Sequence, residues 1–242
     1  MRNVVALVVL SIFLLVGCST RSISDSGYRD GGYYGHRNDN TLYKGEINEF
    51  DVLGIDAGKE YTEEEISNEL KKDKKRISLR KGDSILVIQS GAMIPDQYMI
   101  ENMERYFSVS VFTGVPEKNK EHNSSYSRSL RYSAAKAGIE KIFVYWGVLE
   151  AGSKNLATKT VSWVPIMGWG VPDESQEIRI RLKVALVDVK TGKWEIFTPE
   201  VFHDSAYSAR ANRAQSDQEQ VALLKSMAYK SAVEGTLARY VK

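Results

Sequence analysis

The chain has 242 residues, of which 43% are hydrophobic and 26% charged, and its formal net charge at pH 7 is +2. This composition is typical of a globular protein, and so small a net charge gives no reason to expect a nucleic-acid partner. Cys18 is the only cysteine, so no disulfide can form within the chain and no set of cysteine ligands can hold zinc.

The N-terminus has the pattern of an export signal. Arg2 supplies a positive charge, residues 4–16 are apolar apart from one serine, and Gly17 precedes Cys18. The apolar run is shorter than the roughly 20 residues that span a bilayer, as is typical of a secretory signal peptide. The stretch Leu15-Val16-Gly17-Cys18 resembles the bacterial lipobox. That resemblance implies cleavage after residue 17 and acylation of Cys18.

A lipid-anchored protein is therefore expected. Ser19, where an aspartate would imply retention at the inner membrane, implies sorting to the outer membrane by resemblance to Gram-negative lipoproteins. Several acyl chains on one residue hold a protein more stably than a single chain does. We expect the protein to face the periplasm, with Cys18 as its lipid anchor. The alternative is an ordinary signal peptide followed by a chance cysteine.

Three regions follow from composition: a signal peptide over residues 1–17, a tether over residues 18–47 and a single domain over residues 48–242. The tether is rich in glycine, serine, asparagine and tyrosine and poor in aliphatic residues, so it is expected to be flexible. About 26 flexible residues would give a root-mean-square reach of roughly 25–30 Å.

The domain is expected to alternate strands and helices. Thr62–Glu65 has a capping-box pattern, which predicts a helix to Lys75. The later expected elements are strands near 85–88, 109–112, 142–149, 178–186 and 194–197, and helices after Pro95-Asp96, near Ser127–Ala137 and from Ser216 to the C-terminus. The order from residue 84 is β-α-β-α-β-β-β-α, which predicts an α/β (α+β) fold with helices packed on a mixed β-sheet.

This order resembles that of lipoproteins with an anticodon-binding-domain-like fold, a group that includes CsgG, LpoB and the TolB amino-terminal domain. The resemblance covers roughly residues 84–241 and includes the phrase Leu186-Val187-Asp188-Val189-Lys190-Thr191-Gly192-Lys193. Members of that group are mostly scaffolds, pore formers or activators, which implies a protein-binding role. Fold alone does not choose among these roles.

Catalytic and metal-binding patterns are absent from the sequence. The three histidines, His36, His122 and His203, form no paired ligand motif. His203-Asp204-Ser205 contains the residue types of a hydrolytic triad, but three consecutive residues cannot align as nucleophile, base and orienting group. We therefore expect no enzyme activity, no cofactor and no metal site.

Two segments are candidate binding surfaces. The insert Val161–Pro172 carries four large apolar residues, Trp163, Ile166, Met167 and Trp169, which could contact a partner or a membrane interface. The alternative is that this insert covers the domain's own core. The basic residues near the first helix could contact anionic lipid or peptidoglycan carboxylates, or could simply be solvated at a helix C-terminus. These residues are Lys71, Lys72, Lys74, Lys75 and Arg76.

The expected function is that of a non-enzymatic accessory protein for an envelope assembly, either peptidoglycan synthesis or a secretion machine. Its partners would be the membrane, through the lipid, and an envelope protein, with peptidoglycan as a further candidate. A subunit of a homo-oligomeric secretion channel is the alternative, and an envelope hydrolase is a third reading.

Overall fold

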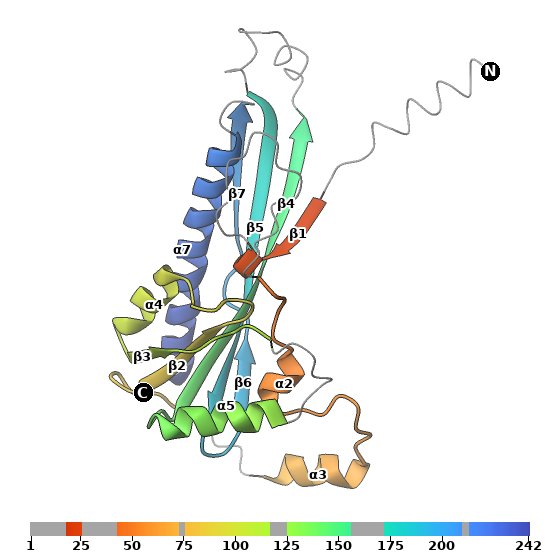
Figure 1. Cartoon of the computed structure of the whole chain (residues 1–242), viewed down its shortest axis with the longest axis vertical. Coiled ribbons are helices and arrows are strands. Elements are labelled where there is room, and N and C mark those ends of the chain that lie inside the picture. The colour runs from red at the N-terminus through yellow and green to blue at the C-terminus, as the bar shows by residue number, and fades with distance from the viewer. Residues whose placement is uncertain (1–17, 26–42, 73–75, 117–124, 156–171, 210–212) are drawn as a thin grey trace, which may run out of the picture. The chain divides into compact units, whose positions relative to one another are not determined.

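The computed structural model describes residues 18–25, 43–72, 76–116, 125–155, 172–209 and 213–242 (Figure 1). The elements in chain order are β1 (Cys18–Ser22), the 3-10 helix η1 (Ile23–Asp25), α2 (Glu49–Leu53), α3 (Glu63–Lys71), β2 (Ser84–Gln89), α4 (Gln97–Glu104), β3 (Ser108–Val111), α5 (Ser125–Lys136), β4 (Lys141–Asn155), β5 (Pro172–Asp188), β6 (Trp194–Phe197), β7 (Phe202–Ala209) and α7 (Arg213–Tyr240).

The strands form one mixed sheet of seven, in the order β3-β2-β4-β5-β6, with β1 paired to β4 and β7 paired to β5. Strand β2 runs parallel to both β3 and β4, whereas β5 is antiparallel to β6 and β7. The expected α/β class with a mixed sheet is confirmed. The strand β7 was not expected, because its sequence, which includes His203-Asp204-Ser205, is polar and lacks a clear alternation.

The chain divides into two compact units. The first unit takes its described residues from Met1–Arg21, Leu149–Ile180 and Phe202–Leu224, and the second from Ser22–Val148, Arg181–Val201 and Lys225–Lys242. Strands β4 and β5 are longer than expected and contribute residues to both units. That length, which the apolar patterns at 142–149 and 178–186 did not indicate, makes a second unit possible.

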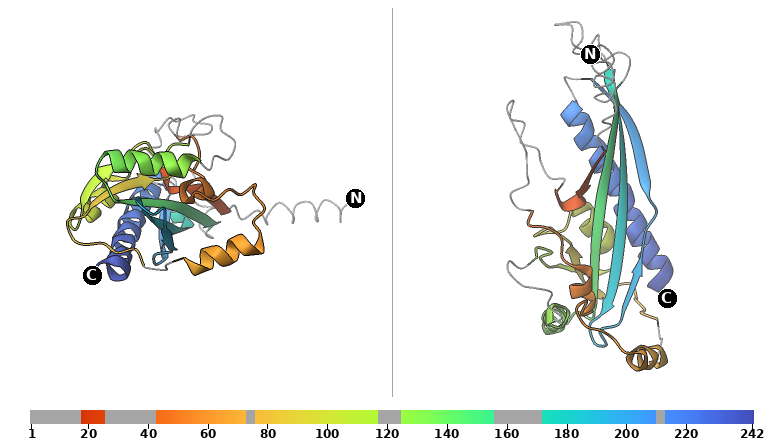
Figure 2. Two further views of the ribbon diagram at one scale, coloured as in Figure 1. Left: turned by 90° about the horizontal axis from the view of Figure 1, so that it is seen from below. Right: turned by 90° about the vertical axis from the view of Figure 1, so that its right-hand side faces the viewer.

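The second unit buries both faces of its parallel strands β2 and β4, whereas the edge strand β3 is mostly exposed. On one face, Leu86 and Ile88 of β2 pack with Leu130 and Ala134 of α5. On the other, the ring of Tyr145 in β4 meets that of Tyr229 in α7 with centroids 5.6 Å apart. Figure 2 shows α5 and α7 on opposite sides of the sheet. Burial on both faces explains why β2 is continuously apolar rather than alternating.

Helix boundaries agree with some sequence signals and differ from others: Asp96 is the N-cap of α4 as expected, whereas α3 ends at Lys71 and not at the predicted Lys75. Thr62 is the N-cap of α3, and Gly138, with a φ of 73°, follows α5 as expected. The predicted start of the last helix at Ser216 is wrong, because α7 begins at Arg213. Ala214 and Gln215 favour helix, so the backbone is already helical before the capping-box pattern is reached.

The segment after Cys18 is also more regular than its composition predicts. Residues 18–25 form β1 and η1, and Ile23 is only 1% exposed. Ile47, at the other end of the expected tether, is buried too, and its N–H donates to Ser90 Oγ at 2.8 Å. Residues 26–42 lie outside the described residues. Ile23 and Ile47, two isolated isoleucines in a polar sequence, are thus buried in the second unit.

Candidate functional site

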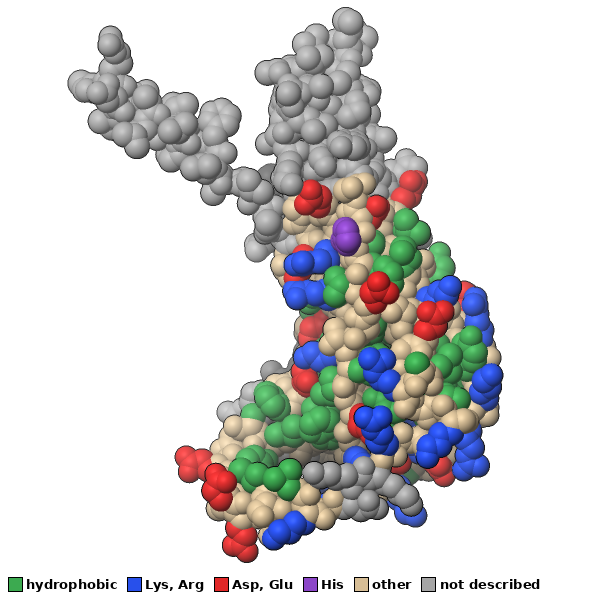
Figure 3. All heavy atoms as spheres, turned by 180° about the vertical axis from the view of Figure 1, so that it is seen from behind, with side chains coloured by type: hydrophobic (Ala, Val, Ile, Leu, Met, Phe, Trp, Pro, Cys, Tyr) green, Lys and Arg blue, Asp and Glu red, His purple; other side chains and the backbone are tan. Residues whose placement is uncertain are grey.

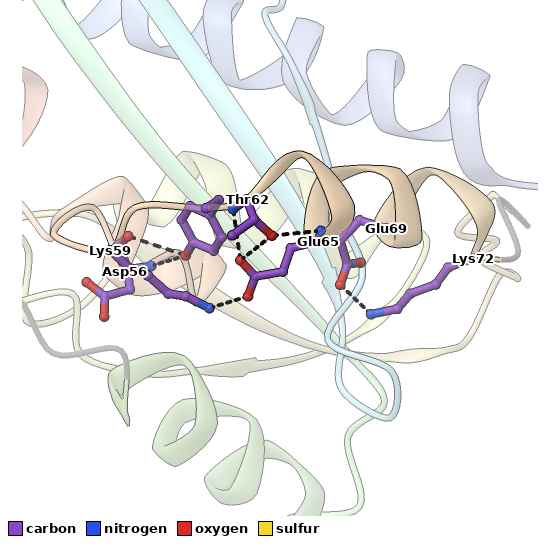
Figure 4. A network of polar contacts seen from close by, with 7 residues as sticks. Asp56, Lys59, Thr62, Glu65, Glu69 and Lys72 are labelled. Atoms are coloured by element: carbon purple, nitrogen blue, oxygen red, sulfur yellow. Dashed lines mark hydrogen bonds and ion pairs between the residues drawn. The ribbon is translucent and has the colours of Figure 1, made fainter.

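The helix α3 in the second unit is held by its own polar contacts (Figure 4). Thr62 Oγ1 accepts a hydrogen bond from Glu65 N at 3.2 Å, and Glu65 Oε2 accepts one from Thr62 N at 2.9 Å. This reciprocal pair is the capping box that the sequence predicts. It satisfies backbone N–H groups that have no partner within the first turn of a helix.

Charged side chains extend this local network at both ends of α3. Lys59 Nζ lies 2.7 Å from Glu65 Oε1 and also stands over the Tyr61 ring, 4.9 Å from its centroid. Hydrogen bonding to Lys59 lowers the pKa of Glu65, and the same bond raises the pKa of Lys59. At the other end Lys72 pairs with Glu69. A helix of nine residues is too short to be stable alone in water, so these contacts maintain it.

The apolar side chains of α3 are not covered. None of its residues is buried, and Ile66 and Leu70 are 45% and 62% exposed. These two residues are four positions apart and therefore lie on the same side of the helix. Tyr61, just before the helix, is exposed as well. Figure 3 shows hydrophobic side chains gathered at the lower left, over the region that carries α3, beside a hollow. An amphipathic helix whose apolar side chains are this exposed is a typical contact surface for a partner.

An open cavity of about 890 Å³ lies beside α3, between its C-terminal end and the turn that joins β5 to β6. Trp194, 38% exposed, supplies an aromatic surface to this cavity. Its charged lining is mixed, because Lys141 Nζ is 3.1 Å from Asp188 Oδ2 and Glu195 Oε1 accepts a hydrogen bond from Ile77 N at 2.8 Å. The cavity is thus lined by charged side chains of both signs together with the apolar side chains of Ile77 and Trp194.

The predicted basic cluster is brought only partly to this cavity. Lys72 and Arg76 line it, whereas Lys71 is the last residue of α3. Lys74 and Lys75 lie outside the described residues. Since Lys72 pairs with Glu69 and Glu195 lies in the same lining, the described part of the cluster is not a purely cationic face.

The other predicted site residues lie elsewhere. The backbone of Cys18 begins β1. The four apolar residues predicted to meet a partner, Trp163, Ile166, Met167 and Trp169, lie outside the described residues. His36 and His122 do so as well. The exposure of α3 was missed, because Ile66 and Leu70 have the spacing of an ordinary core-facing pair and only their surroundings decide whether they are covered.

His203 lies in the first unit, on β7. It is exposed and sits opposite Arg179 of β5, in a cavity of about 640 Å³ that Glu150, Asp204 and Ser205 also line. Arg179 pairs with Glu150 across that cavity. His203, Asp204 and Ser205 are consecutive in a strand, where neighbouring side chains point to opposite faces. Their order therefore brings no nucleophile, base and orienting group into line.

A buried polar network connects α4, α7 and β4 in the second unit. The Tyr145 hydroxyl donates to Gln89 Oε1 at 2.5 Å, and Asp96 Oδ2 accepts from the Tyr229 hydroxyl and lies 2.8 Å from Lys225 Nζ. Burial raises the pKa of both Tyr145 and Tyr229 well above the ordinary value. Both phenols therefore stay protonated as donors, which makes this a structural clamp between helices.

The described residues contain no group of three histidine, cysteine or acidic side chains placed to hold a metal ion. None of the described helices is both long enough and apolar enough to cross a bilayer.

The described elements thus define an α/β protein that presents an uncovered amphipathic helix. Comparison with protein families places it among bacterial lipoproteins, since the family model of the YafT bacterial lipoprotein matches residues 48–239. The chain belongs to the YafT family. A search of curated proteins gives no significant match.

Proposed function

We propose that this lipoprotein is a non-enzymatic accessory protein of the cell envelope, anchored in the outer membrane through acylated Cys18 and facing the periplasm. Membership of a lipoprotein family supports the anchor, and Ser19 after the cysteine supports sorting to the outer membrane. Apart from the additional strand β7, the element order from β2 to α7 is the one that suggests a likeness to the CsgG, LpoB and TolB amino-terminal-domain group, whose members act mainly through other proteins.

The uncovered side of α3 carries this proposal. Ile66 and Leu70 together expose an apolar stripe that costs free energy in water and that no described part of the chain covers. The capping box and the Lys59–Glu65 pair form the helix before any partner arrives. A preformed helix loses little conformational freedom on binding, which favours affinity.

The chemistry of α3 indicates the kind of partner. Apolar residues four apart insert into a hydrophobic groove, as in other helix-in-groove complexes. Glu63 and Glu64 at its start and Lys71 and Lys72 at its end flank the stripe with opposite charges. The partner is therefore an envelope protein with an apolar groove and a rim that is basic at one end and acidic at the other.

Photocrosslinking in cells tests this proposal. A photoreactive residue at Ile66 or Leu70 is expected to give one discrete adduct with an envelope protein, and Leu70→Glu is expected to abolish the adduct formed from position 66. Tyr132 on α5, 69% exposed, is the matched control position and should not give the adduct. Adducts of twice the chain mass would indicate a homo-oligomer instead. Equal labelling from positions 66 and 132 would contradict a site on α3.

A further inference from the structure

Gly147 leaves the space in which Ile23 packs in the second unit. Gly147 lies within β4, where glycine weakens a strand because it adds backbone freedom and no packing. A Cβ at this position would lie 2.7 Å from Ile23 Cδ1 and 2.6 Å from Leu182 Cδ2, closer than side-chain carbons approach. Glycine at 147 therefore leaves the space that Ile23 fills.

Polar contacts fix the residues on either side of Ile23. The Ser24 hydroxyl donates to the Ser90 carbonyl oxygen at 2.5 Å and accepts from Gln89 Nε2 at 2.9 Å. The Ser22 hydroxyl donates to the carboxylate of Glu46. These bonds are directional, so they select one position of the segment, whereas apolar burial alone would tolerate several.

Gly91 is a second glycine that lies beside this segment. Gly91 has a φ of 79°, and a Cβ there would lie 3.1 Å from Ser24 Cβ and 2.7 Å from Tyr43 Cε2. It follows Gln89 and Ser90 at the carboxyl end of β2, next to β4. In open α/β sheets, ligands bind in a crevice at this end, where the connections diverge. In this protein the chain's own N-terminal residues occupy part of that place.

We infer that Ser22–Asp25 is a clasp that docks the lipid-bearing N-terminus onto the second unit and holds that unit close to the membrane. Ile23 follows Cys18 by five residues (23 − 18), which span at most about 17 Å when fully extended. The lipid is thus separated from the docked residue by one short strand, not by a flexible tether. The inference rests on the proposed acylation of Cys18.

Two insertions of the same flexible peptide test the clasp. A 20-residue Gly/Ser peptide is inserted either between Ser19 and Thr20, before the clasp, or between Gly31 and Gly32, after it. Energy transfer is measured in liposomes from a dye on Lys136→Cys to acceptor-labelled lipid. Acylation consumes the thiol of the only natural cysteine, so the dye attaches at one place.

The insertion before the clasp is expected to lower the transfer about twofold or more, since 20 such residues add roughly 25 Å of reach. The insertion after the clasp is expected to leave the transfer unchanged. Equal loss from both insertions, or no loss from either, would overturn the inference. Ile23→Asp places a charge in the apolar socket that Gly147 and Leu182 form, and it is expected to act like the first insertion. Thr20→Asp, at an exposed position, should have no effect.

Failure of the anchor and failure of the clasp give different results. A mass spectrum of the mature protein without acyl chains on Cys18, together with no binding to liposomes, would contradict the proposed anchor. Amide exchange of the protein in solution then tests the clasp alone. Slow exchange of Ile23 and Ser24 supports docking, and exchange at the rate of an unfolded peptide overturns it.

Discussion

Helix α3 and the clasp are both short segments of the second unit, and they are held by opposite means. α3 keeps its shape through contacts among its own neighbours, and its apolar side chains stay exposed. The clasp is held mainly by distant residues, since Ile23 is buried and Ser24 bonds to Ser90, 66 residues away. A segment held by local contacts can present its apolar side chains to a partner. In a segment held by distant residues, the apolar side chain is already buried within the fold.

Filling the clasp's socket should have the largest effect. Gly147→Val is expected to lower the free energy of unfolding by about 3 kcal/mol, because the added carbons overlap Ile23 and Leu182. Urea denaturation measures this change. Gly152→Val is the matched control in the same strand, since a Cβ at Gly152 meets no atom within 4 Å. Equal destabilisation by the two variants would mean that replacing glycine in the strand backbone, and not filling the space of Ile23, lowers the free energy of unfolding.

Removing one phenol from the buried network should cost less. Tyr229→Phe is expected to lower the free energy of unfolding by about 1–2 kcal/mol at pH 7, because Asp96 loses a donor. Tyr132→Phe at the surface is the control. A loss below a few tenths of a kcal/mol would show that Lys225 alone satisfies Asp96.

The buried network of Tyr145 and Tyr229 also predicts that the protein loses stability at high pH. Burial raises the pKa of Tyr145 and Tyr229, so above about pH 10 the folded protein retains protons that the unfolded chain releases. Their contribution is full below that pH and is lost as pH rises through the folded-state pKa. Denaturation between pH 9 and pH 12 should show falling stability, less steeply in Tyr229→Phe. A stability independent of pH in this range would contradict the assignment.

Breaking the local contacts of α3 should act on that helix alone. Thr62→Ala is expected to destabilise the helix by about 1 kcal/mol, which makes its amide exchange roughly fivefold faster. Global unfolding should not change, because α3 buries no residue. Ser67→Ala, within the helix but away from the cap, is the control and should not speed exchange. A matching loss of global stability would show that α3 packs on the rest of the unit.

The ion pair at the start of α3 predicts a weaker effect of acid. Hydrogen bonding to Lys59 lowers the pKa of Glu65 below its unfolded value, so this support is present above that value and is lost as pH falls through the folded-state pKa. NMR titration should give Glu65 a low pKa that Lys59→Gln moves back toward about 4.3. An unchanged pKa in that variant would assign the shift to the cap at Thr62.

The smallest effect is expected in the cavity beside α3. Lys72→Gln combined with Arg76→Gln should weaken pelleting with peptidoglycan sacculi only slightly, because Lys72 already pairs with Glu69. Trp194→Ala in the same cavity is the companion variant, and a larger loss from it would make the aromatic side chain the main contact. Unchanged pelleting in both variants would exclude this cavity as a peptidoglycan site.

Sequence reasoning succeeded where a signal is local. Thr62 and Glu65 are three positions apart, so the start of α3 could be predicted, and the long alternating pattern ending near Leu186 predicted β5. It failed where the deciding residues are far apart. Nothing near Ile23 indicates that Gly147 and Leu182 leave a socket for it. In the candidate site, the helix was predictable but its exposure was not, because exposure depends on what the rest of the chain leaves uncovered.

In the proposed export of this lipoprotein, the space that Ile23 fills would also set an order of events. Ile23 would be among the first residues of the mature chain to leave the cytoplasm, whereas Leu182, which borders that space, would leave late. Until then the segment after Cys18 has nowhere to dock. Under the proposed acylation of Cys18, the enzymes that cleave and acylate it would therefore meet an open N-terminus, which docks only after Leu182 has arrived.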